Sequence, residues 1–130
     1  MKISGNHTIL IIDDNDVSRS MLRHILSSDI RHKVVGEAGS GKLGLEMMER
    51  HRPDVVCLDI HMQDSNGLDV LRQIKKQWPH TIVLMVSGNN DRNTILEAAQ
   101  GGANGYLVKP FNPTGLLNTI EQAIAKARSQ

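Results

Sequence analysis

The sequence predicts an α/β domain in which five parallel strands form one doubly wound sheet with helices on both faces. Five short apolar stretches alternate with five stretches of helical periodicity along the 130 residues. The apolar stretches are continuous and not alternating, which is typical of parallel strands buried on both faces. No internal repeat, low-complexity segment or linker interrupts this order, so a single domain, 1–130, with a core of about residues 8–127 is expected.

Each expected strand stops at a breaker or at a polar residue. The third strand follows Pro53 and ends on Asp59. The fourth stops at Ser87, and the fifth is followed by Lys109. Short apolar runs bounded in this way are typical of strands. Strands are therefore expected at residues 8–13, 33–36, 54–59, 81–86 and 106–108.

Helices are expected between these strands and after the last one. Asn15 or Asp16 can cap the first helix, and Pro79 ends the third. Gly101 stops the fourth helix, and Pro113 suits the first turn of the last one. The middle helices are expected at about residues 42–50, 68–78 and 92–100. The inward faces of the first and last helices are expected to comprise Val17, Met21, Leu22, Ile25 and Leu26, and Leu116, Ile120, Ala123, Ile124 and Ala127.

Composition excludes several classes of protein. The net charge of +1 gives no reason to expect nucleic acid or a membrane surface as a direct partner. Cys57 is the only cysteine, so an intrachain disulfide is excluded, and a buried strand residue in a cytoplasmic protein is expected. The first seven residues are short and polar, unlike a signal peptide, and no apolar run approaches the roughly 20 residues of a membrane helix.

Polar side chains end four of the expected strands. These residues are Asp13, Asp14, Asp59, Ser87 and Lys109. Because the carboxyl ends of parallel strands lie at one edge of a sheet, we expect these side chains to converge. Clustered carboxylates repel one another unless a cation lies among them, and oxygen ligands suit Mg²⁺. The lysine and serine could then hold an anionic ligand such as a phosphoryl group.

In this order, the motifs resemble the receiver domain of two-component response regulators, above all its short, stand-alone chemotaxis-type (CheY-like) members. The segments that carry the resemblance are 11–14, 58–62 with Gly67, 86–88 and 105–111. The resemblance extends over about residues 8–127 and implies the flavodoxin-like (βα)5 fold with strand order 2-1-3-4-5. It also implies a phosphoprotein that carries an aspartyl phosphate in signal transduction.

The resemblance assigns roles to the acidic cluster. Asp59 matches the phosphoacceptor, which takes a phosphoryl group from a sensor histidine kinase or a phosphotransfer protein. Asp14 and Asp59 would bind Mg²⁺ through their side chains, His61 through its backbone carbonyl and Asp13 through water. Lys109 would pair with the acceptor and then with the phosphoryl oxygens. Self-phosphotransfer and autodephosphorylation are implied, and turnover as an enzyme is not.

The resemblance assigns a second group of residues to switching and to signal lifetime. Ser87 would hydrogen-bond the phosphoryl group, and Tyr106 would rotate inward with it, although plain core packing is the alternative for Tyr106. The Lys109-Pro110 bond matches a peptide bond that is usually cis in the family. His61 and Asn89 match positions linked to autodephosphorylation rate. An output protein or domain would bind the face of the fourth helix, fifth strand and last helix, and a phosphorylation-dependent dimer is also compatible with the family.

Two features depart from the family pattern or compete with it. Gln63 stands where the family very often has proline, so the loop after Asp59 is predicted to be less rigid. Residues 36–43 fit the P-loop spacing G-x-x-x-x-G-K, but Leu43 follows where a hydroxyl is required to bind Mg²⁺. Two alternatives remain for the function: a receiver fragment of a longer regulator whose output domain is missing, or an unphosphorylated interaction scaffold.

Overall fold

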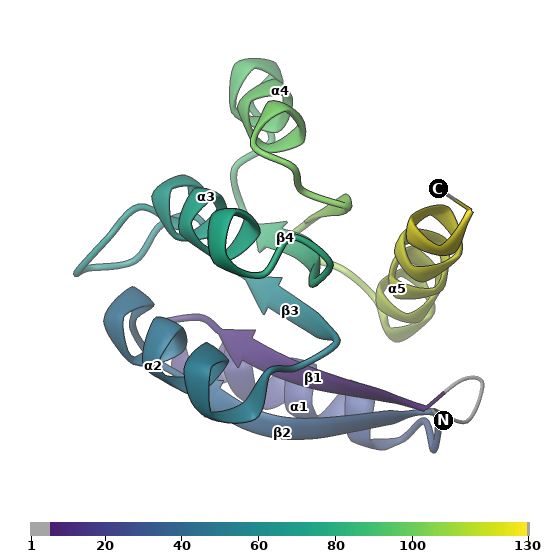
Figure 1. Cartoon of the computed structure of the whole chain (residues 1–130). Helices are drawn as coiled ribbons and strands as arrows, with labels where there is room; N and C mark the ends of the chain where they lie inside the picture. Colours follow the sequence, from purple (N-terminus) through teal and green to yellow (C-terminus); the bar gives the residue numbers. More distant parts are fainter. Residues whose placement is uncertain (1–5, 130) are drawn as a thin grey trace.

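Ten elements alternate along the chain in the computed structural model, which describes residues 6–129. The elements are β1 (His7–Ile12), α1 (Asp16–Ser27), β2 (His32–Ala38), α2 (Gly41–His51), β3 (Val55–Leu58), α3 (Gly67–Gln77), β4 (Ile82–Ser87), α4 (Arg92–Gln100), β5 (Gly105–Val108) and α5 (Pro113–Arg128). All five strands are parallel, in the order β2-β1-β3-β4-β5 (Figure 1). The predicted fold class and strand order are confirmed.

The sheet divides the core into two layers, which explains why the buried positions of β1 and β3 are apolar on both faces. In β1, Ile9 and Ile11 pack toward α1 and α5. Leu10 and Ile12 pack on the other face, toward the layer formed with α2, α3 and α4. Strand β3 repeats this alternation, and its Cys57 is buried in the α1–α5 layer, where burial raises the pKa of the thiol to about 12. Cys57 is therefore the buried strand residue that was expected.

The capping residues act largely as the sequence predicts. The Asn15 side chain accepts a hydrogen bond from the Ser18 amide at the start of α1, so Asn15 and not Asp16 is the cap. Pro113 lies in the first turn of α5. The Lys109-Pro110 peptide bond is cis. Strand β2 is three residues longer than expected, because its pairing with β1 begins one residue earlier, at His32, and continues two residues past Gly36.

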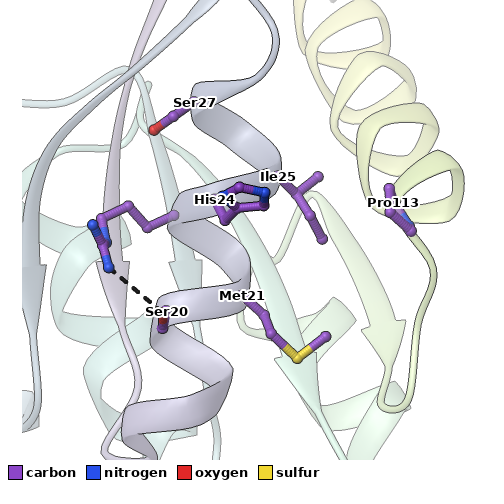
Figure 2. A pocket seen from close by; sticks show the side chains of 7 residues that line it. Ser20, Met21, His24, Ile25, Ser27 and Pro113 are labelled. Carbon is purple, nitrogen blue, oxygen red and sulfur yellow. Dashed lines mark hydrogen bonds between the residues drawn. The ribbon is translucent and has the colours of Figure 1, made fainter.

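The predicted inward face of α1 is wrong at two positions. Leu22, Ile25 and Leu26 are buried, but Val17 is 70% exposed and Met21 is 47% exposed. Met21 lies beside a hollow between α1 and the first residue of α5, Pro113, where no helix covers it (Figure 2). Helical periodicity finds an apolar stripe, but it cannot tell which part of the stripe faces the sheet.

No helix within residues 6–129 combines the length and the apolar character that crossing a membrane requires.

Candidate functional site

The predicted acidic cluster forms at the carboxyl edge of the sheet. Asp13 follows β1 and is 1% exposed, and Asp59 follows β3 and is 7% exposed. Asp14 lies beside them and is partly exposed. The three carboxylates offer oxygens that all lie within 4.8 Å of one another. Two strand ends that are 46 residues apart in the chain become neighbours because β1 and β3 pair directly.

Lys109 supplies the positive charge that this cluster needs. Its Nζ donates to Asp13 Oδ2 over 2.9 Å and to Asp59 Oδ2 over 3.1 Å. Burial acts to lower the pKa of Lys109, but the hydrogen bond to Asp13 and the charge of Asp59 outweigh it, so this pKa is raised. Lys109 therefore remains charged at neutral pH.

The pKa of Asp13 is raised, mainly because its carboxylate is buried. Hydrogen bonds from the Asn15 amide and from Lys109 lower it again in part. Three carboxylates and one ammonium leave two negative charges in the cluster, which a divalent cation would neutralise. The all-oxygen donor set and partial access to solvent through Asp14 fit Mg²⁺.

Asn89 links the remaining predicted residues to one another. The Asn89 amide accepts from the Asp91 backbone through Oδ1, so Nδ2 faces His61 and lies 3.1 Å from its Nε2. The Asn89 backbone amide donates to Ser87 Oγ over 3.1 Å. The Tyr106 hydroxyl donates to the Asn89 carbonyl over 2.6 Å, and burial raises the pKa of this phenol. The sequence singled out these positions separately, without any signal that Asn89 joins them.

The loop between β3 and α3 is tied to its surroundings by its backbone. The Ile60 amide donates to Asp59 Oδ1 over 2.7 Å, and the Gly67 amide donates to the Ile60 carbonyl over 2.6 Å. Gly67 has to be glycine, since a Cβ there would collide with the Asp59 carbonyl. His61 forms an isolated bridge with Asn66 within the same loop.

Position 63 is also tied down, despite the missing proline. The Gln63 amide donates to Asp14 Oδ2 over 3.0 Å, a contact that a proline could not make. The lower rigidity of this loop stays a prediction. The structure gives the loop a hydrogen bond to a carboxylate of the site in place of the proline ring.

Asp64, in the loop after Asp59, contacts the start of α2, and the sequence did not predict this contact. Its carboxylate accepts from the Gly41 and Lys42 amides over 3.0 and 3.1 Å, and these hydrogen bonds hold its pKa below the usual range. It therefore caps α2 from a distance of more than 20 residues in sequence. The amides that a P-loop would offer to a phosphate are occupied by this carboxylate, which agrees with rejecting that motif.

A family model and the similar proteins all indicate the same family. The family description "Response regulator receiver domain" matches residues 9–121. The chain is 35% identical over 118 residues to the nitrate/nitrite response regulator NarL of Escherichia coli, covering 91% of the chain and 55% of that protein. It is 33% identical over 118 residues to the chemotaxis protein CheY of Bacillus subtilis, covering 91% of the chain and 98% of that protein.

Solved structures agree with these relatives. The signal receiver domain of the putative response regulator NarL from Mycobacterium tuberculosis superposes with a TM-score of 0.86 at 28% identity, covering 96% of this chain and 98% of that one. The response regulator domain of Thermotoga maritima CheB gives a TM-score of 0.78 at 32% identity, covering 95% of both chains. The chain thus spans nearly all of some relatives but only about half the length of NarL and of the Bacillus subtilis regulator YdfI.

Proposed function

The chain belongs to the response regulator receiver domain family of two-component systems, and on this premise we propose that Asp59 accepts a phosphoryl group from a histidine kinase or a phosphotransfer protein. One observation carries the assignment to Asp59. The Asp59 carboxylate lies in the acidic cluster, contacts Lys109 and directly follows β3, the central strand of the sheet. Asp13 shares the first two properties, but it is almost fully buried.

The residues around Asp59 suit an in-line attack on phosphorus. The Ile60 amide and the Lys109 ammonium each hold one oxygen of the Asp59 carboxylate, so its orientation is fixed before the donor arrives. A carboxylate oxygen forms the new O–P bond while the bond from phosphorus to the donor breaks, and the leaving group keeps the bonding electrons. Lys109 then has a phosphoryl oxygen to pair with, which removes part of the repulsion between two anions.

Asp13, Asp14 and Asp59 would hold Mg²⁺, and the His61 carbonyl would complete the protein ligands. When bound, this ion would neutralise the charge of the acceptor and of the phosphoryl oxygens. The observation that supports the assignment is the excess of two negative charges in a cluster of oxygen donors. The site handles its own phosphoryl group and releases it to water, so we regard the chain as a switch and not as a turnover enzyme.

Ser87 and Tyr106 are positioned to report the state of Asp59. Ser87 is fully buried at the end of β4, and its hydroxyl oxygen accepts from the Asn89 amide. Drawing Ser87 toward a phosphoryl group would move the Asn89 backbone, and with it the carbonyl that holds Tyr106. We expect this movement to alter the face formed by α4, β5 and α5, where an output protein or domain would bind.

The exposed apolar part of α1 suits the phosphodonor protein. Val17 and Met21 lie in the first half of the helix that begins directly after Asp13 and Asp14. A hollow of about 520 Å³ lies beside Met21 and is lined on its far side by Pro113 of α5 (Figure 2). A donor that brings a phosphohistidine to Asp59 would contact this surface. Met21→Asp is expected to slow transfer from the cognate kinase while leaving phosphorylation by acetyl phosphate unchanged.

The test of the proposed function is phosphorylation by acetyl phosphate, followed by intact mass measurement. We expect the mass to rise by one phosphoryl group when Mg²⁺ is present. The rise should be absent in Asp59→Ala and when Mg²⁺ is chelated, and Asp69→Ala serves as a control outside the cluster. No incorporation by the wild-type protein would contradict the proposal and favour an interaction scaffold.

A further inference from the structure

Asp14 differs from its two neighbours in what holds its carboxylate. Asp13 and Asp59 are paired with Lys109, whereas Asp14 has no cationic partner among the ion pairs of residues 6–129. Within that part of the chain, the only hydrogen bond to its side chain comes from the Gln63 amide, over 3.0 Å to Oδ2. One backbone N–H, 49 residues away in sequence, therefore sets the orientation of the most accessible carboxylate of the site.

The Gln63 amide is itself fixed by anchors on both sides. Before it, Asp59 and Ile60 are tied by the hydrogen bond from the Ile60 amide. After it, the Asp64 carboxylate is held by the Gly41 and Lys42 amides at the start of α2. The residue between these anchors presents its N–H in a position set by the loop and not by its own side chain, which is exposed.

We propose that the Gln63 backbone amide positions Asp14 for Mg²⁺. The inference rests on the proposed function only in taking Mg²⁺ as the ligand of the acidic cluster. The amide occupies Oδ2 and restricts rotation of the carboxylate, so that Oδ1 remains available for the ion. A ligand that is already oriented loses less conformational freedom on binding, and hydrogen bonds to ligating carboxylates typically raise affinity in this way. Gln63 is therefore a positioning residue that acts through its main chain.

The test compares two substitutions that differ in one backbone N–H. Gln63→Ala removes the side chain and keeps the donor, whereas Gln63→Pro removes both. Calorimetric titration with Mg²⁺ alone, without any phosphodonor, measures the dissociation constant. We expect Gln63→Ala to stay within about twofold of wild type and Gln63→Pro to bind about tenfold more weakly, at the lower end of the usual effect of such contacts. Equal affinity in all three proteins would overturn the proposal.

A proline could also distort the loop, so a second variant isolates the donor. Replacing Gln63 by the corresponding α-hydroxy acid turns the amide into an ester and removes the N–H with little change of shape. The same loss of affinity as in Gln63→Pro supports the proposal, and wild-type affinity in the ester protein overturns it. The hydrogen bond can also be tested without Mg²⁺ by NMR. The amide proton resonance of residue 63 should move upfield in Asp14→Ala, because that substitution removes the acceptor.

The outcome is separable from that of the proposed function. At saturating Mg²⁺, Gln63→Pro should still be phosphorylated on Asp59 by acetyl phosphate, because the nucleophile and Lys109 are unchanged. If the wild-type protein binds Mg²⁺ in a manner that depends on the residue 63 amide but is never phosphorylated, the proposed function fails and the positioning role stands. If the wild-type protein binds no Mg²⁺, the positioning role fails.

Discussion

Strand β1 carries buried titratable side chains at both of its ends, and the two ends handle burial differently. At the carboxyl edge of the sheet, the buried carboxylate of Asp13 pairs with Lys109 over 2.9 Å. At the amino edge, His7 of β1 faces His32 of β2 in register, with the ring centroids 5.8 Å apart. The His7 Nε2 lies 3.1 Å from a guanidinium nitrogen of Arg128.

His32 makes the contrast sharper. Its side chain is fully buried, and neither ring nitrogen has a hydrogen-bond partner. Burial is the main reason that its pKa is lowered, opposed in part by the charges of Asp29 and Glu121. At the amino edge, burial thus disfavours the charged form of the His32 imidazole, whereas at the carboxyl edge buried carboxylates are compensated by Lys109.

The largest effect is expected from removing the cation of the carboxyl edge. Lys109→Ala leaves Asp13 and Asp59 without their cationic partner, and breaking a buried ion pair typically destabilises a protein by about 3 kcal/mol. Urea unfolding without Mg²⁺ should show this loss, and added Mg²⁺ should restore part of it, because another cation then compensates the carboxylates. An unchanged unfolding midpoint without Mg²⁺ would show that the carboxylates need no compensation.

At the amino edge, replacing an imidazole by an apolar ring is expected to stabilise the protein. His32→Phe removes two buried polar atoms that lack partners, which should raise the free energy of unfolding at neutral pH by about 1 kcal/mol. Urea unfolding at pH 7.5 measures this change in the free energy of unfolding. His24→Phe, on the surface of α1, is the matched control. A loss of stability would mean that the ring makes a favourable contact in the folded state.

The same substitution should change how stability depends on pH. The pKa of His32 is lower in the folded protein than in the unfolded chain, so the unfolded chain binds more protons below its ordinary value near 6.5. The contribution of His32 to stability is therefore complete above that pH and is lost as the pH falls through the folded-state pKa. His32→Phe should flatten this decline between pH 7 and 5. An identical decline in both proteins would assign the decline to other groups.

A smaller gain is expected from removing one negative charge at the carboxyl edge. Asp59→Asn relieves the repulsion between the buried carboxylates of Asp59 and Asp13. The lost contact with Lys109 offsets most of this gain, so a net stabilisation of less than about 1 kcal/mol should remain. Thermal unfolding in the presence of a chelator measures the difference. Lower stability would show that the Lys109 contact outweighs the repulsion.

The smallest effect is expected on the surface of the amino edge. Glu121 of α5 pairs with Arg31 over 3.0 Å, and both side chains are more than 40% exposed. Exposed pairs of this kind contribute little to stability. Glu121→Gln should leave the urea midpoint unchanged at pH 7.5, and a clear loss would show that α5 is held to the sheet by this charge.

The carboxyl edge was largely predictable from the sequence, and the amino edge was not. Each of the four residues Asp13, Asp59, Ser87 and Lys109 ends or directly follows a strand, and the parallel topology then brings them together. The pairing of His7 with His32 depends on the register of β1 against β2, which no local pattern specifies.

Contacts made by the backbone or between loops could not be predicted from the sequence either. Asp64 caps a helix that begins 23 residues earlier, and the Gln63 amide leaves no trace in the type of side chain. Asn89 could be placed near the acceptor from the family resemblance, but its contacts with His61 and Tyr106 depend on how two loops meet. The wrong assignment of Val17 and Met21 has the same origin, since exposure is decided by neighbouring elements.

The close approach of Gly41 to the loop after Asp59 restricts which residues can replace it during evolution. A Cβ at position 41 would collide with the Ser65 hydroxyl, next to the carboxylate that caps α2. A lineage that acquires a larger residue at position 41 would thus have to shorten or shift residue 65 as well. We expect the two codons to change together across orthologous genes, as a paired signature of how this loop is anchored.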